Sequence, residues 1–189
     1  ACAVYQNHSN PSSFKLCEAE SYDLNDESPS CPPEVSEMGN ELGDVVPEVA
    51  LLECGSDFPI NHRGMCGNIL SITYQINVDC GPCIGYVNAV LGPLQEEFGP
   101  HGVQFYVVYD EPDECDTGRY FRDGAEEIKY VFAPLRFAYS HLFGTGGRAS
   151  TLILSAGNRI EYYGKGDGTD PNGPSSEMLR AYIEAALNP

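Results

Sequence analysis

Two cysteines separated by two residues are the clearest chemical feature of the sequence. They occur in the tetrapeptide Cys80-Gly81-Pro82-Cys83. Two thiols at this spacing can close a disulfide with each other or exchange it with another disulfide, and the thiolate is the nucleophile. The start of a helix would lower the pKa of the first thiol through its partial positive charge, and proline fits a first helical turn because its missing N–H costs nothing there. The motif therefore predicts redox-type chemistry if it opens a helix.

The residues around the motif predict that local structure. Residues 69–76 alternate in β-forming apolar side chains and predict a strand immediately before the motif. Apolar residues at helical spacing predict a helix over 81–98, kinked at Gly92-Pro93 and ended by Gly99-Pro100. Residues 103–109 are apolar at all but one position, as in a strand buried on both faces. This order predicts a right-handed βαβ crossover with the motif at the first strand-to-helix junction.

The elements after this unit follow from shorter signals. Residues 126–143 predict mixed helical structure with a break near Pro134. Two short apolar runs, 151–154 and 159–163, flank Ala156-Gly157-Asn158 and predict a hairpin. A last helix is expected from Ser176 to Leu187, capped by a serine and with an apolar face turned inward.

This layout resembles the thioredoxin fold, and the tetrapeptide matches the thioredoxin active-site motif letter for letter. The resemblance covers roughly residues 55–187. Asp57-Phe58-Pro59-Ile60 and a long insertion between Tyr109 and Thr151 are more similar to the redoxin branch, which includes bacterial thiol oxidoreductases and peroxiredoxins. The resemblance implies an α/β domain with a central mixed sheet and flanking helices, protein thiols or disulfides as partners, and no cofactor. It also implies that Cys80 attacks and that Cys83 resolves the mixed disulfide.

Three features depart from the thioredoxin pattern. Asp79 replaces the aromatic residue that usually precedes the first cysteine, and its negative charge opposes thiolate formation. The chain contains no tryptophan. The loop expected to face the motif reads Arg148-Ala149-Ser150-Thr151, without the proline that the family holds in the cis form. These departures weaken the prediction of catalysis more than the prediction of fold.

Peroxide reduction is a further activity found in the redoxin branch. Arg148 lies where peroxiredoxins carry an arginine that activates the reacting cysteine. Those enzymes also need the pattern Pro-x-x-x-Thr-x-x-Cys, but Thr73 and Asn77 occupy its proline and threonine positions when it is aligned on Cys80. The sequence therefore does not predict a peroxidase.

The first part of the chain has a different composition from the rest. Residues 1–48 carry ten acidic residues against the single Lys15, with frequent serine, proline and asparagine. Such composition buries too little apolar surface to order itself. We therefore expect two parts: an acidic N-terminal arm over 1–48, held by disulfides or by a neighbouring subunit, and a thioredoxin-like domain over 49–189.

The cysteine count indicates an oxidising compartment. The chain of 189 residues contains eight cysteines and begins Ala1-Cys2-Ala3, as a mature chain does after removal of a signal peptide, so we expect a secreted or extracytoplasmic, lumenal protein. Cys54 and Cys66 flank a hairpin-like segment and are the preferred disulfide pair. Asn7 begins an N-glycosylation triplet. The cysteines expected to pair outside the motif are Cys2, Cys17, Cys31, Cys54, Cys66 and Cys115.

Charge and composition exclude several function classes. The net charge of −18 repels nucleic acid and anionic lipid surfaces. No apolar run approaches the roughly 20 residues needed to cross a bilayer. The four scattered histidines do not have the spacing of a zinc site, and residues 167–173 lack the ligand pattern of a calcium loop, so no metal is expected.

Two hypotheses of different classes remain open. The first is a secreted thiol-disulfide oxidoreductase that uses the Cys80 and Cys83 dithiol. The second is a secreted, non-catalytic structural or assembly subunit that keeps the fold and forms an oligomer or filament by strand addition. Fold alone does not decide between them.

Overall fold

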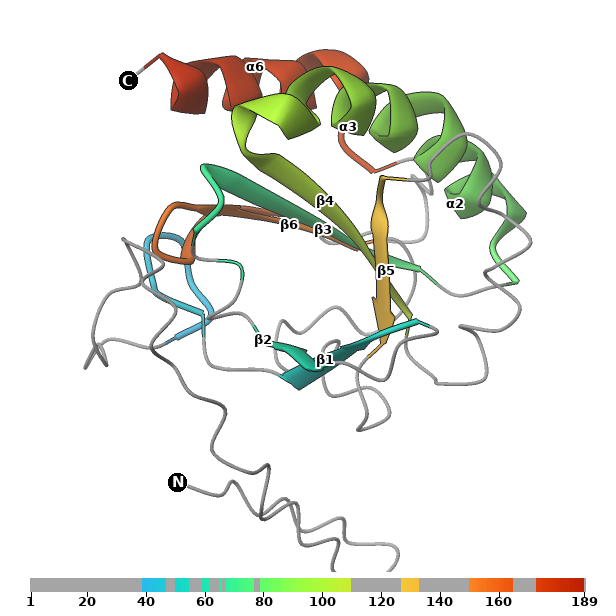
Figure 1. Cartoon of the computed structure of the whole chain (residues 1–189), viewed down its shortest axis with the longest axis horizontal. Helices are drawn as coiled ribbons and strands as arrows, with labels where there is room; N and C mark the ends of the chain where they lie inside the picture. Colours follow the sequence, from blue (N-terminus) through green and yellow to red (C-terminus); the bar gives the residue numbers. More distant parts are fainter. Residues whose placement is uncertain are drawn as a thin grey trace, which may run out of the picture.

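The computed structural model describes residues 39–46, 50–54, 59–61, 65, 67–76, 79–109, 127–132, 150–164 and 173–188. These residues form a seven-stranded sheet in the order β2-β1-β5-β4-β3-β6-β7, with helices packed on it (Figure 1). The strands are β1 (Ala50–Glu53), β2 (Pro59–Asn61), β3 (Leu70–Ile76), β4 (Val103–Tyr109), β5 (Lys129–Phe132), β6 (Ser150–Ser155) and β7 (Arg159–Gly164).

The centre of the sheet is mixed, as expected. Strand β3 pairs in parallel with β4 and antiparallel with β6. All seven residues of β3 are buried, because both faces of the sheet carry an apolar cluster. Alternate residues serve the two faces: Phe105 and Val107 join the cluster under the helices, whereas Tyr106 and Val108 join the cluster on the opposite face.

The described helices lie on one face of the sheet (Figure 1). The predicted helix over 81–98 consists of α2 (Gly81–Tyr86), the π-helical segment η1 (Val87–Leu91) and α3 (Gly92–Phe98), followed by the 3₁₀ turn η2 (Gly99–His101). The irregularity predicted at Gly92-Pro93 is a π-helical turn just before it. Pro93 cannot donate a backbone hydrogen bond and its ring crowds the preceding turn, and a wider turn accommodates both effects.

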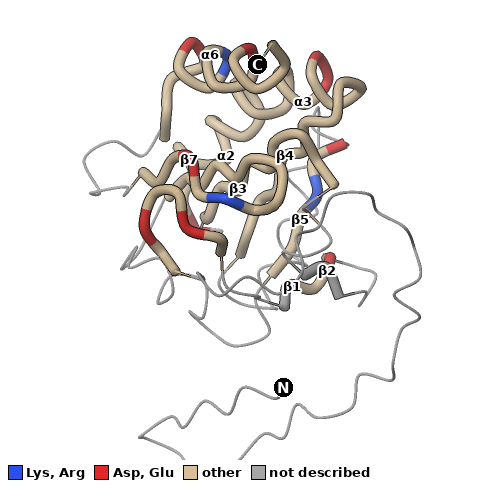
Figure 2. The backbone as a smooth tube through the Cα atoms, turned by 90° about the vertical axis from the view of Figure 1, so that its left-hand side faces the viewer, with Lys and Arg blue, Asp and Glu red and all other residues tan. Residues whose placement is uncertain are grey.

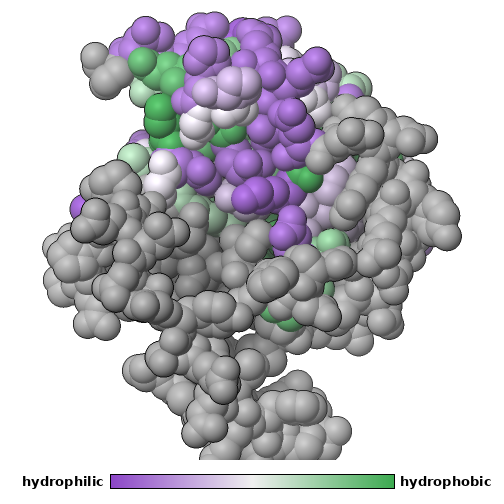
Figure 3. All heavy atoms as spheres, in the orientation of Figure 1, coloured by the Kyte–Doolittle hydropathy of each residue, from purple (hydrophilic) through white to green (hydrophobic). Residues whose placement is uncertain are grey.

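The last helix, α6 (Ser176–Leu187), confirms the predicted bounds. Ser175 is its N-cap and accepts a hydrogen bond from the Met178 N–H at 3.1 Å. Leu179 and Ile183 are buried against the cluster under the helices. Figure 3 shows that the outer surface of this helical layer is mostly hydrophilic, as expected where a layer faces solvent.

The prediction of mixed helical structure over 126–143 was wrong for its first part. Residues 129–132 form β5, which pairs in parallel with β4 from Tyr106↔Lys129 to Tyr109↔Phe132. Tyr130, Val131 and Phe132 are all buried, and aromatic and β-branched residues suit a central strand. A run of four residues is too short for its periodicity to separate strand from helix. Residues 133–143 lie outside the described residues.

The hairpin expected near Cys54 begins earlier in the chain than predicted. Strand β1 pairs antiparallel with β2, and β1 also pairs with β5. Cys54 therefore directly follows the first hairpin strand, where its N–H donates to the Tyr130 carbonyl at 2.8 Å. The second predicted hairpin is confirmed: β6 and β7 are joined by a turn in which Gly157 and Asn158 adopt φ values of 80° and 60°.

Only the end of the predicted acidic arm falls within the described residues. Residues 39–46 lie against the β6–β7 hairpin, where Val45 forms an antiparallel bridge with Arg159. Val45 and Val46 are buried. The remaining arm, with Asn7 and its three cysteines, lies outside the described residues, so the division at residue 48 stays a prediction.

Candidate functional site

Cys80 and Cys83 lie where the sequence predicts, between β3 and the helix. A disulfide joins them, with their Cα atoms 5.2 Å apart. Cys80 is the N-cap of α2: the Cys83 N–H points at its sulfur at 3.3 Å, and Pro82 occupies the first turn. The tetrapeptide therefore opens a helix, which the predicted chemistry requires.

The two sulfur-bearing residues differ in exposure. Cys83 is fully buried, with 0% of its surface exposed, and belongs to the cluster under the helices. Cys80 is half-buried, while the neighbouring residues Asp79, Gly81 and Pro82 are exposed. A partner disulfide can thus approach Cys80 from solvent but cannot approach Cys83 directly.

The chain segment that carries the motif contains few charged residues. Between residues 67 and 95 the only charged side chain is that of Asp79. A thiolate at Cys80 would therefore depend on the N–H groups and dipole of the helix start and would receive no help from a basic side chain in this segment. Asp79 acts against it through its like charge.

A pair of tyrosines supports the helix behind the motif. Tyr86 lies one turn after Cys83, and its hydroxyl donates to the Pro174 carbonyl at 2.5 Å. Its ring lies 4.9 Å, centroid to centroid, from that of Tyr74 on β3. Gly173 adopts a φ of +62°, and a Cβ there would lie 3.2 Å from both rings. This contact holds the motif helix against the segment that leads into α6.

Sequence reasoning did not single out these supporting residues. The available signal was a tyrosine at an inward helical position, since a buried phenol usually needs a hydrogen-bond partner. The partner itself was not identifiable, because Pro174 is 88 residues further along the chain. Gly173 precedes the serine cap of α6, but only the packed structure shows that its missing side chain matters.

The predicted motif-facing loop is described in part. Ser150 is the first residue of β6 and is buried. Its hydroxyl donates a hydrogen bond to the side-chain oxygen of Gln75 at 3.1 Å. Gln75 and Ser150 are register partners at the end of β3 from which the chain runs into the motif. Arg148 and Ala149 lie outside the described residues, and the described backbone contains no cis peptide bond.

Of the predicted disulfide between Cys54 and Cys66, only Cys54 is described. Cys54 is disulfide-bonded. Because Cys80 and Cys83 pair with each other, the partner of Cys54 is one of the cysteines outside the described residues. Its pairing with Cys66 stays a prediction.

The described residues show neither a metal cluster nor a membrane helix. No group of three or more histidine, cysteine, aspartate or glutamate side chains among them could hold a metal ion. No helix in the described ranges is long and apolar enough to cross a bilayer.

The sheet order, the disulfide at the start of the central helix and the closing helix define a thioredoxin-like fold. Solved structures with this fold match most of the chain. One, assigned as the thiol:disulfide interchange protein DsbE of Chlorobium tepidum, has a TM-score of 0.61 and 18% identity and covers 78% of this chain and 99% of its own.

Two further solved structures are similar to this chain in fold. A thio-disulfide isomerase from Thermus thermophilus has a TM-score of 0.60 and 16% identity, covering 77% of this chain and 96% of its own. A peroxiredoxin-like protein from Aquifex aeolicus has a TM-score of 0.59 and 13% identity, covering 83% of this chain and 91% of its own. Neither a protein-family model nor a curated protein sequence matches the chain. At these identities the likeness establishes the fold.

Proposed function

We propose that this protein is a thiol-disulfide oxidoreductase that works through Cys80 and Cys83 on protein thiols or disulfides. The observation that carries the proposal is the unequal exposure of the two cysteines at the start of one helix. An exchange reaction needs one sulfur that partners can reach and a second that acts only within the protein. Cys80 and Cys83 meet these two needs in turn.

The proposed reaction is a two-electron exchange. In the reduced protein the Cys80 thiolate attacks one sulfur of a partner disulfide, forming a mixed disulfide and releasing the other sulfur as a thiolate that takes up a proton. Cys83 then gives up its proton and attacks the Cys80 sulfur. This step restores the Cys80–Cys83 disulfide and releases the partner as a dithiol. The reverse sequence oxidises a partner dithiol.

Three observations support this function and an extracytoplasmic setting. The named solved structures of similar fold include an interchange protein and an isomerase that act on disulfides. Cys54 forms a second disulfide, apart from the motif. Stable disulfides and a high cysteine count fit an oxidising compartment, where protein thiols and disulfides are available partners. Glycosylation at Asn7 and the Cys54–Cys66 pairing belong to the same proposal.

The second candidate is a non-catalytic assembly subunit with the same fold. Asp79 favours it, because a negative charge beside Cys80 disfavours the nucleophile. In that case the motif is a permanent disulfide that fixes the helix start, and assembly uses the edges of the sheet.

A turnover assay separates the two candidates. The purified full-length protein is supplied with a fluorescent-quenched disulfide peptide and a thiol reductant, and peptide cleavage is followed. We expect the wild type to turn over the peptide and Cys80→Ser to abolish this turnover. The control variant Ala89→Ser adds a hydroxyl at an exposed site on the same helix and should leave turnover unchanged. Equal rates for the wild type and Cys80→Ser would contradict the oxidoreductase and favour the assembly subunit.

A further inference from the structure

We propose that the outer edge of β7 binds an extended, positively charged segment of a partner protein. The site is distinct from the motif, and its ligand needs no cysteine. The inference therefore goes beyond the proposed function and does not depend on it.

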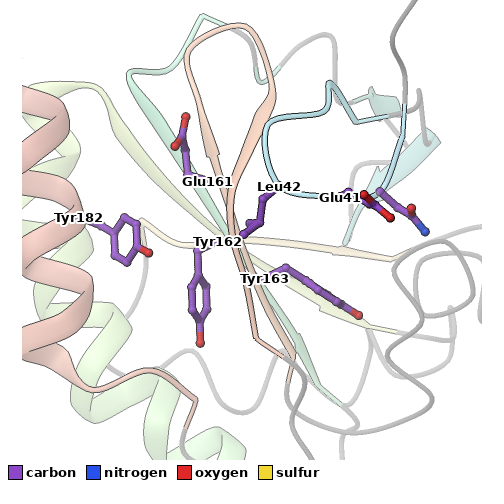
Figure 4. A pocket seen from close by; sticks show the side chains of 7 residues that line it. Glu41, Leu42, Glu161, Tyr162, Tyr163 and Tyr182 are labelled. Carbon is purple, nitrogen blue, oxygen red and sulfur yellow. The ribbon is translucent and has the colours of Figure 1, made fainter.

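The proposed site is a groove of about 470 Å³ (Figure 4). It runs around the edge of the sheet, because Tyr162 packs with the cluster under the helices and Tyr163 with the cluster on the opposite face. Tyr182 of α6 closes one side, with its ring 5.8 Å from that of Tyr162. The lining residues are Asn40, Glu41, Leu42, Glu161, Tyr162, Tyr163 and Tyr182.

Among the described residues, the backbone at this edge is covered only at its first end. Residues 43–46 bond to the start of β7: the Gly43 N–H donates to the Ile160 carbonyl at 2.8 Å, and the Ile160 N–H to the Asp44 carbonyl at 2.9 Å. Beyond Ile160, no strand in the described residues pairs with the outer edge of β7. An extended peptide can continue this pairing as an added strand.

The side chains of the groove favour a cation. Burial raises the pKa of Tyr162 and of Tyr163 above the ordinary value of a phenol, so both side chains are neutral at neutral pH, and a neutral aromatic ring attracts a cation. Glu41 and Glu161 are exposed carboxylates at the rim. Glu161 accepts one hydrogen bond from the Ser155 hydroxyl at 2.6 Å, which uses one of the roughly four acceptor sites of a carboxylate.

One apolar side chain adds area for the alternate residues of an added strand. Leu42 is 69% exposed, more than any other large apolar residue described. A strand presents successive side chains to opposite sides, so lysine or arginine can alternate with apolar residues along the groove. The groove therefore fits a segment in which basic and apolar residues alternate.

The negative charge of this protein favours a positively charged partner. Figure 2 shows acidic residues on the chain beside β7. The whole chain carries a net charge of −18, which disfavours a second copy of itself as the ligand. Within the described residues of β7 the one basic side chain is that of Arg159, which lies at the covered end and donates to the Gly43 carbonyl at 2.9 Å. A basic segment of another protein is the complementary occupant.

The test is a titration of the full-length protein with a fluorescein-labelled peptide of alternating lysine and valine, followed by anisotropy. The comparison peptide alternates glutamate and valine. We expect only the basic peptide to bind, and the double variant Glu41→Lys/Glu161→Lys to weaken that binding by about tenfold or more. The matched variant Glu96→Lys/Glu184→Lys makes the same charge change at exposed sites on α3 and α6.

Two outcomes of the titration would overturn the proposal. One is equal binding of the two peptides, and the other is equal weakening by the two double variants, which would reflect net charge alone. Hydrogen exchange gives an independent readout: bound basic peptide should slow exchange of amides in residues 162–164. Protection confined to other elements would also overturn it. Because the probe contains no cysteine, none of these results depends on turnover at Cys80.

Discussion

The hydroxyl of Tyr86 donates to the carbonyl of Pro174 at 2.5 Å, and this bond joins the motif helix to the start of α6. It is buried, and the neighbouring ring of Tyr74 packs on that of Tyr86. The position of Cys83, one turn before Tyr86, therefore depends on a segment that lies far away in the sequence. The first two predictions test this support.

Removing the Tyr86 hydroxyl should destabilise the domain. Tyr86→Phe keeps the ring but leaves the buried Pro174 carbonyl without this donor, at an expected cost of about 1–3 kcal/mol. The measurement is urea unfolding of the oxidised protein. Tyr182→Phe, on a half-buried tyrosine of α6, is the control and should change stability little. Equal stability of the two variants would contradict the supporting role.

Replacing Gly173 with alanine, which adds only a methyl group, should destabilise the fold. Gly173→Ala forces a residue with a Cβ into a φ of +62° and places that Cβ 3.2 Å from Tyr74 and Tyr86. We expect a loss of about 2–4 kcal/mol, from the backbone conformation and the close contact together. Gly43→Ala is the control, because its φ is +88° but no atom lies within 4 Å of the added Cβ. A loss no larger than that of Gly43→Ala would show that the contact is unimportant.

Asp79 should slow the reaction of Cys80. In reduced protein, Asp79→Asn removes the only charge between residues 67 and 95, and we expect alkylation by iodoacetamide near neutral pH to accelerate about threefold. Glu96→Gln, exposed later on the same helical segment, should leave the rate unchanged. A rate for Asp79→Asn at or below that of the wild type would contradict this electrostatic role.

An ion pair joins α3 to α6, and its contribution to the stability of the fold should be lost at acid pH. The Arg180 guanidinium donates to Glu97 through both nitrogens, at 2.5 and 2.6 Å, and lowers the pKa of that carboxyl from its usual 4.5. A lowered folded-state pKa stabilises the fold above the unfolded-state value, and the contribution is lost as the pH falls through the folded-state value.

The corresponding measurement is the melting temperature as a function of pH. Glu97→Gln should melt below the wild type at neutral pH, and the difference should shrink as the pH falls below 4.5. Both residues are exposed, so the shift should be small and should decrease with added salt. Glu96→Gln, which removes the same charge from an exposed position of α3, is the matched control. A constant difference at all pH values would contradict the ion pair's contribution.

Local signals were sufficient to predict the elements that position the motif. The strand before Cys80, the helix after it, the second parallel strand and the serine-capped last helix all follow from periodicity and end signals. Each of these elements is long or has a clear boundary residue, such as Ser175 or Gly99. The resemblance of the tetrapeptide to thioredoxin then indicated how the elements are assembled.

The features that sequence reasoning missed depend on contacts between distant segments. Strand β5 has only four residues and is a strand because β4 and β1 lie on either side of it. The bond from Tyr86 to Pro174 and the groove beside β7 join residues that are far apart in the chain. No local pattern specifies such pairings, because tertiary packing decides them.

Trapping the mixed disulfide tests the central claim most directly. Cys83→Ser protein, reduced and then exposed to a biotin-labelled disulfide peptide, should accumulate a covalent adduct that peptide mapping by mass spectrometry locates on Cys80, because no resolving sulfur remains. The wild type should release the peptide as thiol and return to the Cys80–Cys83 disulfide. The absence of an adduct on Cys80, or an equal yield of adduct in Cys80→Ser/Cys83→Ser protein, would contradict the oxidoreductase account.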